Sequence, residues 1–232
     1  MHPTPAQFVT VLGTPPRATP GDLAWPRVHW SDDLEGALNW AILSQTGTAS
    51  CTISTAGYHT GMHSLRTATR TVDKAEDDQI TVDQICTAPA EDYWTLDVWL
   101  DLPAVAPAKE WDLQLASWTG GHIYTATLKH LTAAHKFQYI NAAGASTDVP
   151  AGGYNWPATT WVHITLQIRR STLQWGTVTW PAGSADLSAQ GLRDGGADAG
   201  SGARLLLQAV ASANPPIILH SDTWRLLHGP TP

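Results

Sequence analysis

The sequence has few charged residues and few cysteines. Only 14% of its 232 residues are charged, and 13 lysines and arginines against 20 aspartates and glutamates give a formal charge of -7 at pH 7. A chain without a basic surface attracts neither the phosphates of nucleic acids nor the headgroups of anionic membranes. We therefore expect neither nucleic acid nor a membrane as a partner.

The two cysteines suggest no disulfide framework. Cys51 lies in "SCTIS" and Cys86 in "ITVDQIC", both of which read as strands. The two residues form a disulfide only if these strands meet in space, and otherwise they are buried free thiols; the sequence leaves both alternatives open. A chain of this length buries roughly 70% of its unfolded surface. It therefore needs no covalent or metal scaffold to fold.

Motifs of the common hydrolases and metalloenzymes are also missing. A glycan hydrolase needs two neighbouring carboxylates, one to protonate the leaving group and one to attack or to activate water. The chain's 4 glutamates belong to no E-x-D-x-x-E pattern, and there is no G-x-S-x-G, H-E-x-x-H or zinc-type Cys/His spacing. A lyase built on His, Tyr and Lys around "HIYTATLKH", residues 122–130, stays open. The absence of motifs leads us to expect no enzymatic activity.

What the sequence does contain is a long series of short strand-like runs. In "TTWVHITLQIR", residues 159–169, hydrophobic side chains from Val162 to Ile168 alternate with polar ones from His163 to Arg169. This alternation predicts a strand with one buried face. Comparable runs lie at 50–54, 63–70, 79–86, 93–100, 111–118, 121–130, 135–141, 160–169, 172–180, 203–210 and 216–227. The series predicts an all-β fold of two packed antiparallel sheets.

Three segments do not fit the strand pattern. Residues 1–30 hold six prolines and lack both the regions of a signal peptide and the length of a membrane span. We predict that they form an extended N-terminal arm that contacts another polypeptide, with "FVTVL" adding a strand to a partner's sheet. The alternative is that the arm docks on the chain's own domain. "DDLEGALNWAIL", residues 32–43, allows one or two helical turns, and residues 185–203 have the composition of a flexible loop.

The order of segments from residue 32 to about 228 resembles the concanavalin A-like jelly roll of lectins, glucanases and carbohydrate-binding modules. The resemblance rests on "DDLEGALNW" at 32–40, "GMHSL" at 61–65, "YWTLDVWLDLP" at 93–103, "TTW" at 159–161 and "SDTWRLL" at 221–227. It implies a two-sheet antiparallel jelly-roll sandwich over residues 31–228, between the arm and a C-terminal tail of residues 229–232. Two features depart from the family: the hairpin "RRST" after Ile168, and a single aspartate after Ser221.

In such a sandwich, the outward faces of two strands form a candidate carbohydrate site. A sugar ring lays its C–H bonds on an aromatic plane, while its hydroxyls need directional polar partners. The candidate residues are Tyr93, Asp97, Trp99, Trp161 and His163. The alternative is that Trp161 is a structural residue beneath a loop and His163 an ordinary surface histidine.

The resemblance also implies a structural calcium ion that ties the first strand to the last. The positions that match its ligands are Glu35 and Asp222, with Asp33 as an alternative. Oxygen ligands of this kind suit Ca²⁺. The alternative is that these are surface acids near strand ends, which are common.

Two function classes remain open. The first is a non-enzymatic structural protein of a bacteriophage virion, either a capsid decoration or a tail component. Its arm would bind other virion subunits or copies of itself, and its jelly roll would bind cell-surface glycan. The second is a carbohydrate-binding module or a glycan-active hydrolase or lyase. Fold alone does not choose between them; we favour the first, with a virion location, because virions leave the cell by lysis and need no export signal.

Overall fold

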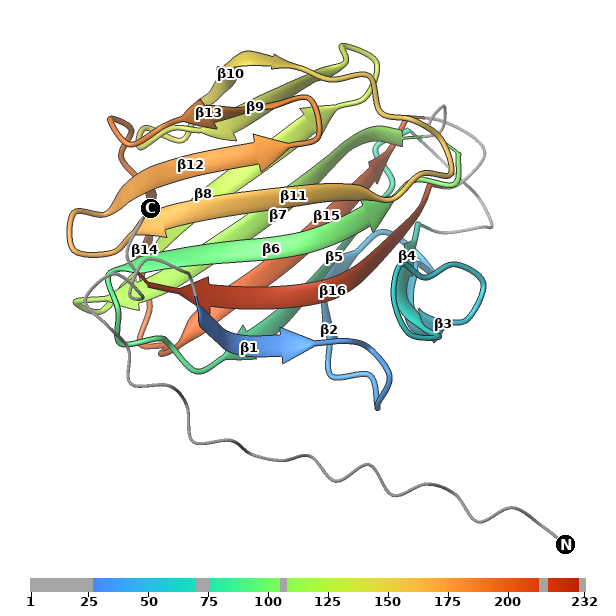
Figure 1. Cartoon of the computed structure of the whole chain (residues 1–232), viewed down its shortest axis with the longest axis horizontal. Coiled ribbons are helices and arrows are strands. Elements are labelled where there is room, and N and C mark those ends of the chain that lie inside the picture. Colours follow the sequence, from blue (N-terminus) through green and yellow to red (C-terminus); the bar gives the residue numbers. More distant parts are fainter. Residues whose placement is uncertain (1–26, 70–75, 105–107, 213–216, 230–232) are drawn as a thin grey trace, which may run out of the picture.

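The protein is a sandwich of two antiparallel sheets (Figure 1). The computed structural model describes residues 27–69, 76–104, 108–212 and 217–229. These residues form 16 strands, and no helix among them is long and apolar enough to cross a membrane. The predicted jelly-roll fold is confirmed. Residues 1–26, most of the predicted arm, lie outside the described part of the chain.

Sheet A contains eight strands and carries the predicted carbohydrate site. In spatial order they are β13 (Gly183–Asp186), β12 (Gln174–Trp180), β11 (Val162–Arg169), β6 (Tyr93–Asp101), β16 (Ile218–His228), β4 (Ser64–Ala68) and β3 (Ser50–Ser54), with β1 (Arg27–Asp32) also beside β16. The register of β6 and β11 sets Trp99 opposite His163, and Tyr93 opposite Arg169. The residues predicted to bind sugar therefore lie on the central strands of this sheet.

Sheet B also contains eight strands and packs behind sheet A in the view of Figure 1. Its order is β10 (Ser146–Gly153), β9 (Lys136–Ile140), β8 (His122–Leu131), β7 (Ala108–Thr119), β15 (Ala203–Ala211), β5 (Gln79–Cys86) and β2 (Ala41–Gln45), with β14 (Arg193–Ala197) also beside β8. Long antiparallel pairings of β15 with β5 and β7 form its centre.

The core lies between the two sheets and is built by strict alternation. Val162, Ile164, Leu166 and Ile168 of β11 are fully buried, while His163 and Gln167 are half-buried and Arg169 is exposed. The predicted register of this strand is thus confirmed. Neighbouring β6 adds Trp94, Leu96, Val98 and Leu100, and sheet B adds Leu113, Leu115, Leu205 and Leu207. Each such side chain contributes about 1.5 to 3 kcal/mol when it leaves water.

Several local expectations are wrong, and each has a physical reason. The segment 32–43 forms no helical turn: Asp32 accepts hydrogen bonds from the Leu34 amide at 2.8 Å and from Trp40 Nε1 at 3.1 Å, which hold a turn instead. Strand β14 forms inside the segment expected to be a loop because β8 offers it a free edge. Strand β1 pairs with β16, and the domain boundary at residue 31 stays a prediction.

The two cysteines are both buried free thiols. Cys51 belongs to β3 of sheet A and Cys86 to β5 of sheet B. Burial raises the pKa of the Cys51 thiol to about 12 and that of the Cys86 thiol to about 11. Of the two alternatives left open by the sequence, the structure has the free thiols.

A buried histidine lies in an aromatic cluster at one end of the core. The His130 ring stacks on Trp111 with the ring centroids 5.6 Å apart, and its Nε2 lies 3.0 Å from the carbonyl oxygen of Tyr154. Burial lowers the pKa of His130 to about 4, so the ring is neutral at pH 7. Acid must therefore charge a group that the fold buries.

We predict that replacing His130 by Phe weakens the acid sensitivity of the fold. Between pH 6.5 and 4 the unfolded histidine binds a proton that the folded one does not, so stability falls as the pH falls through this window. A pKa difference of this size corresponds to roughly 3 kcal/mol at most. Urea unfolding at a series of pH values measures the slope. Phe137→Leu is the control, because it removes packing without a titrating group; equal slopes in wild type and His130→Phe would contradict the prediction.

Candidate functional site

The outer face of sheet A brings most of the predicted carbohydrate residues together. Asp97 and Trp99 project outward from β6, His163 lies opposite Trp99 on β11, and Trp161 directly precedes β11. Tyr93 lies on the same face, but six residues from Trp99, or about 20 Å along an extended strand. The face therefore has a cluster around Trp99 and a separate end at Tyr93.

Trp99 stands between two histidines. The His59 ring stacks on it at a centroid distance of 3.7 Å, and the His163 ring at 4.7 Å. His163 comes from β11 on one side of β6, while the amide of His59 is held at 2.7 Å by Asp222 of β16 on the other side. The faces of the Trp99 ring are thus covered by other side chains of the protein. The sequence could not single out His59, because a loop brings it to this face.

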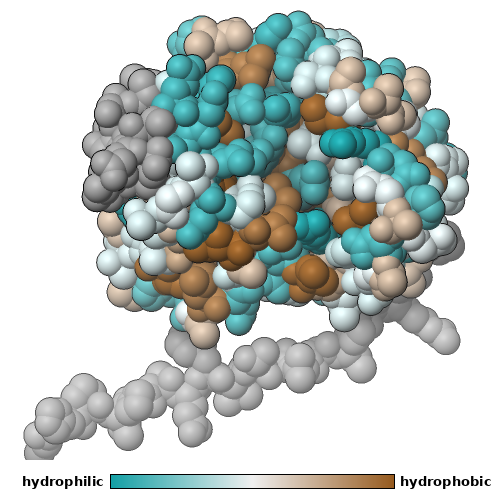
Figure 2. Space-filling model, turned by 180° about the vertical axis from the view of Figure 1, so that it is seen from behind, coloured by the Kyte–Doolittle hydropathy of each residue, from teal (hydrophilic) through white to brown (hydrophobic). Residues whose placement is uncertain are grey.

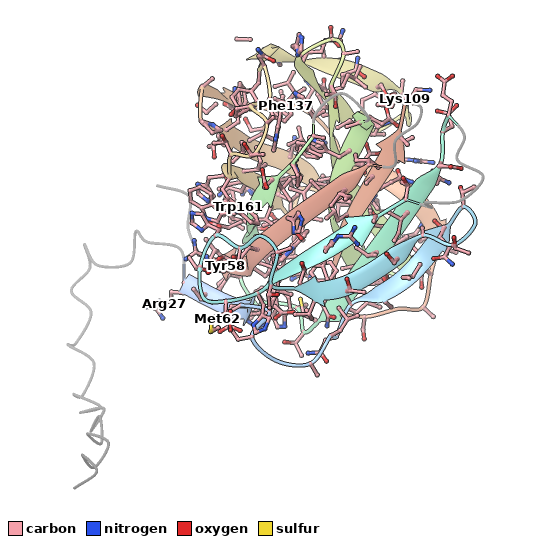
Figure 3. The ribbon with its side chains drawn as sticks, turned by 90° about the vertical axis from the view of Figure 1, so that its right-hand side faces the viewer. Arg27, Tyr58, Met62, Lys109, Phe137 and Trp161 are labelled. Atoms are coloured by element: carbon pink, nitrogen blue, oxygen red, sulfur yellow. The ribbon has the colours of Figure 1, made fainter. Side chains whose placement is uncertain are left out.

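The loop of residues 55–63, between β3 and β4, lies across this end of the face. Figure 3 labels its Tyr58 and Met62, with Trp161 beside it. Trp161 meets the His59 ring edge to face at 5.9 Å and is half-buried, while Tyr58 is exposed. Trp161 therefore lies beside a loop, as its structural alternative had it, and still keeps part of its surface open.

Two acids fix this loop through its backbone. Asp222 accepts hydrogen bonds from the amides of His59 and Thr60 at 2.7 and 2.8 Å. Glu35 accepts them from the amides of Met62 and His63, at 2.5 and 3.0 Å, and lies 2.9 Å from His63 Nδ1. The amide of Met62, above all, lowers the pKa of Glu35. The loop is thus held by two acidic side chains from outside it.

These hydrogen bonds bear on the predicted calcium ion. The oxygens of Glu35 and Asp222 face N–H donors, whose protons occupy the positions that a cation would need. The alternative ligand Asp33 accepts a hydrogen bond from the Glu35 amide at 3.3 Å. In the part of the chain that the structure describes, no group of three or more His, Cys, Asp or Glu could hold a metal ion. The residues present do not fit a calcium site, and the addition of a chelator tests the calcium ion that the resemblance implies.

Asp97 organises the polar part of the cluster. Its buried carboxylate lies 3.1 Å from Arg225 Nη2 through each oxygen, and its Oδ1 lies 3.1 Å from His163 Nε2 without the alignment of a hydrogen bond. Arg225 and His163 therefore share one buried negative charge. This arrangement fixes the charged groups that surround Trp99.

Tyr93 lies in a pocket of about 360 Å³ at the other end of the face. The pocket is lined by residues of four neighbouring strands and the turn after them, among them Tyr93, Gln167, Arg169, Thr177, Asp186 and Ser188. An aromatic side chain and several polar ones thus surround a space of the size that small ligands use.

The outer face of sheet B carries a second cluster. Lys129 Nζ of β8 lies 3.1 Å from Glu110 and 3.7 Å from Asp112, two outward residues of β7. Burial raises the pKa of the Asp112 carboxyl to about 7, although Lys129 opposes the shift. Asp112 Oδ1 is buried without a hydrogen-bond partner. A carboxyl that titrates near neutrality beside a second carboxylate is a common feature of catalytic sites.

This cluster could have been found in the sequence. "EWD" places Glu110 and Asp112 two residues apart in a strand, and so on one face. A search restricted to E-x-D-x-x-E overlooks such a pair. The open lyase alternative is not assembled by β8 itself, because Lys129 faces outward while Tyr124 packs against the core and His130 is buried in it.

Amide and hydroxyl side chains continue this surface across sheet B. Gln208 donates to Gln79 and Thr81 at 3.1 and 3.0 Å, and Gln114 donates to Thr127 at 2.8 Å. Figure 2 views the molecule from this side, with hydrophilic residues across the face and hydrophobic ones gathered beside them. The face presents polar groups in rows but few aromatic rings.

Comparison with known proteins places the fold. No protein-family model and no curated protein matches the chain. An endo-β-1,4-glucuronan lyase from the fungus Trichoderma reesei is similar with a TM-score of 0.55 at 10% identity, over 87% of this chain and 96% of that one. A β-glucanase from Bacillus licheniformis has a TM-score of 0.51 at 12% identity, over 85% and 96%. A sialidase has a TM-score of 0.52 at 14% identity, over 86% of this chain but 18% of its own.

These similarities confirm the concanavalin A-like jelly roll, a fold that glycan-acting proteins use. At such identities they show the fold alone. They also overturn one expectation: the absence of sequence motifs does not make the chain non-enzymatic, because the similar structures are those of a lyase, a glucanase and a sialidase. The expectation of no enzymatic activity is therefore corrected: it rested on missing motifs alone, and the fold is shared by a lyase, a glucanase and a sialidase.

We predict that Glu35 holds the loop of residues 55–63 and that no metal ion is needed. Glu35→Gln should accelerate hydrogen exchange of the amides of residues 59–63, because a neutral amide accepts the Met62 and His63 bonds more weakly. Exchange measured by mass spectrometry should not change when a chelator is added to the wild type. Glu91→Gln, at an acid that pairs with His228 instead, is the control. A chelator-dependent drop in melting temperature would establish the calcium ion and contradict this account.

Proposed function

We propose that the protein binds glycans on the outer face of sheet A. The observation that carries the proposal is the gathering of aromatic rings and polar groups on one face of a fold that glycan-acting proteins share. The rings are Tyr58, His59, Trp99, Trp161, His163 and, at the far end, Tyr93. Asp97 and Arg225 supply charged partners between the two ends.

The ring that a sugar would meet is not the one expected first. Trp99 is enclosed by His59 and His163, so its role is to support the cluster. Trp161, beside the loop, and Tyr58, within it, keep exposed surface. A sugar stacked there would have the imidazoles of the cluster next to it as hydrogen-bond partners.

We predict that Trp161→Ala abolishes retention on a glycan array while the fold stays intact. Loss of one stacking ring from a site of this kind costs on the order of tenfold or more in affinity. Trp118→Ala is the matched control, because Trp118 is a half-buried tryptophan of sheet B. Retention lost in the control and kept in Trp161→Ala would move the glycan to sheet B, and no retention of the wild type on any glycan would contradict the proposal.

A second candidate function is glycan cleavage at the cluster of Glu110, Asp112 and Lys129. What favours it is the raised pKa of Asp112, which keeps a fraction of this carboxyl protonated at neutral pH, next to Glu110, which shares Lys129 with it. A protonated carboxyl can give its proton to a leaving-group oxygen, and a neighbouring carboxylate can activate water.

If this cluster is catalytic, Asp112→Asn should lower the release of reducing ends from a cleaved polysaccharide by about a hundredfold or more. In the wild type, the rate should fall as the pH rises above about 7, because the acid form of Asp112 is lost. Ile85→Ala, at an exposed residue two strands away from the cluster on the same sheet, should leave the rate unchanged. An equal rate in Asp112→Asn would contradict this candidate.

The virion role remains a prediction from the sequence. It is supported by the six prolines and the hydrophobic residues of the N-terminal arm, which gain most from contact with another surface. Such a role is compatible with glycan binding. Light scattering of the full chain and of a chain lacking residues 1–26 tests the arm: an oligomer that persists without it would contradict the prediction.

A further inference from the structure

The pocket beside Tyr93 depends on a glycine in one strand that leaves room for a side chain of the neighbouring strand. Gly176 of β12 has no side chain, and a Cβ there would come within 2.6 Å of Gln167 Oε1 on β11. The amide of Gln167 uses this room and faces the pocket that it lines. Tyr93 forms another wall, with the guanidinium of Arg169 5.5 Å from its ring centroid. The site thus joins an aromatic surface to an amide.

Two groups of the lining, Gln167 Oε1 and the carboxylate of Asp186, accept hydrogen bonds. Gln167 donates a hydrogen bond from its Nε2 to Thr95 Oγ1 at 3.3 Å, while its Oε1 is buried and has no hydrogen-bond partner. Asp186 accepts a bond from the amide of Ser188 at 2.8 Å, and Ser188 lowers the pKa of this carboxyl. A ligand that meets these two acceptors must donate hydrogen bonds to them, as a hydroxyl does and a carboxylate does not.

The charges around the pocket also favour an uncharged ligand over an anionic one. Arg169 is the cation of its lining, and its Nε lies 2.9 Å from Asp92, whose carboxylate neutralises it. Asp186 then remains as an ionised acid on the opposite wall. A negatively charged ligand would bring its charge towards Asp186 without a free cation to balance it.

We propose that this pocket binds one uncharged sugar ring. The hydroxyls of the ring donate hydrogen bonds to Gln167 Oε1 and Asp186, and its C–H face lies on Tyr93. The pocket thereby discriminates against sugars that carry a carboxylate. A volume of about 360 Å³ suits a single ring at the end of a chain or as a branch. The inference rests on the proposed function, since it names the sugar class that the outer face of sheet A takes. It adds Asp186, on an edge strand of the sheet, to the residues of this face that the sequence pointed to.

The experiment measures binding of the full chain to trisaccharides by calorimetry. Neutral β-linked trimers of glucose, galactose and mannose are each paired with the trimer of the corresponding uronic acid. We expect at least one neutral trimer to bind at least tenfold more tightly than its uronate partner. Gln167→Leu should weaken the affinity for that neutral trimer tenfold or more. Asp186→Asn should raise the affinity for the uronate to within about threefold of that for the neutral trimer. Gln138→Leu on sheet B is the matched control and should bind as the wild type does.

The possible results separate this inference from the proposed function. Uronates that bind as tightly as neutral trimers, with no effect of Asp186→Asn, would overturn the sugar class and leave glycan binding in place. Neutral binding that survives Gln167→Leu but is lost in Trp161→Ala would place the sugar at the other end of the face and overturn the pocket. If neither the trimers nor a glycan array show binding, the proposed function fails as well. Thermal melts of each variant check that the sandwich is intact.

Discussion

The register between β6 and β11 is the constraint on which the rest of the structure depends. It places Trp94, Leu96, Ile164 and Leu166 in the core, and it thereby leaves Tyr93, Asp97, Trp99 and His163 on the outer face. A shift of one residue would exchange the two faces of either strand. The hydrophobic core and the candidate site are therefore specified together, and the site needs no separate positioning beyond the pairing that folds the domain.

The loop of residues 55–63 converts this surface from a flat sheet into a site. Glu35 and Asp222 are far apart in the sequence, yet both accept hydrogen bonds from backbone amides of the same short loop. Once the loop is fixed, His59 covers one side of Trp99, and Tyr58 and Trp161 define the open end. The same two carboxylates were read from the sequence as metal ligands; in the structure, backbone amides stand where the cation was expected.

Local patterns predicted what depends on alternation and missed what depends on distant partners. The strands and the buried residues from Val162 to Ile168 followed from period-two patterning and are confirmed. The turn at Asp32 was missed because it is decided by hydrogen bonds to Trp40, and β14 because it is decided by the edge of β8. His59 reaches Trp99 through tertiary contacts that no spacing in the sequence reveals. Asp112 and Lys129 belong to strands that were predicted, but their meeting across β7 and β8 requires the register. The expected lack of enzymatic activity was corrected for a different reason, because it rested on missing motifs alone, whereas the fold is shared by enzymes.

The two free thiols have a consequence for where such a domain can work. Cys51 and Cys86 are buried in different sheets, and burial holds both thiols protonated, whereas disulfide exchange and oxidation proceed through the thiolate. The sandwich therefore has no covalent cross-link to lose in a reducing environment and no reactive thiol to lose in an oxidising one. Because the described fold depends on no disulfide, the same folded state can form under reducing conditions and persist under oxidising ones without an oxidase, an isomerase or a protecting reductant.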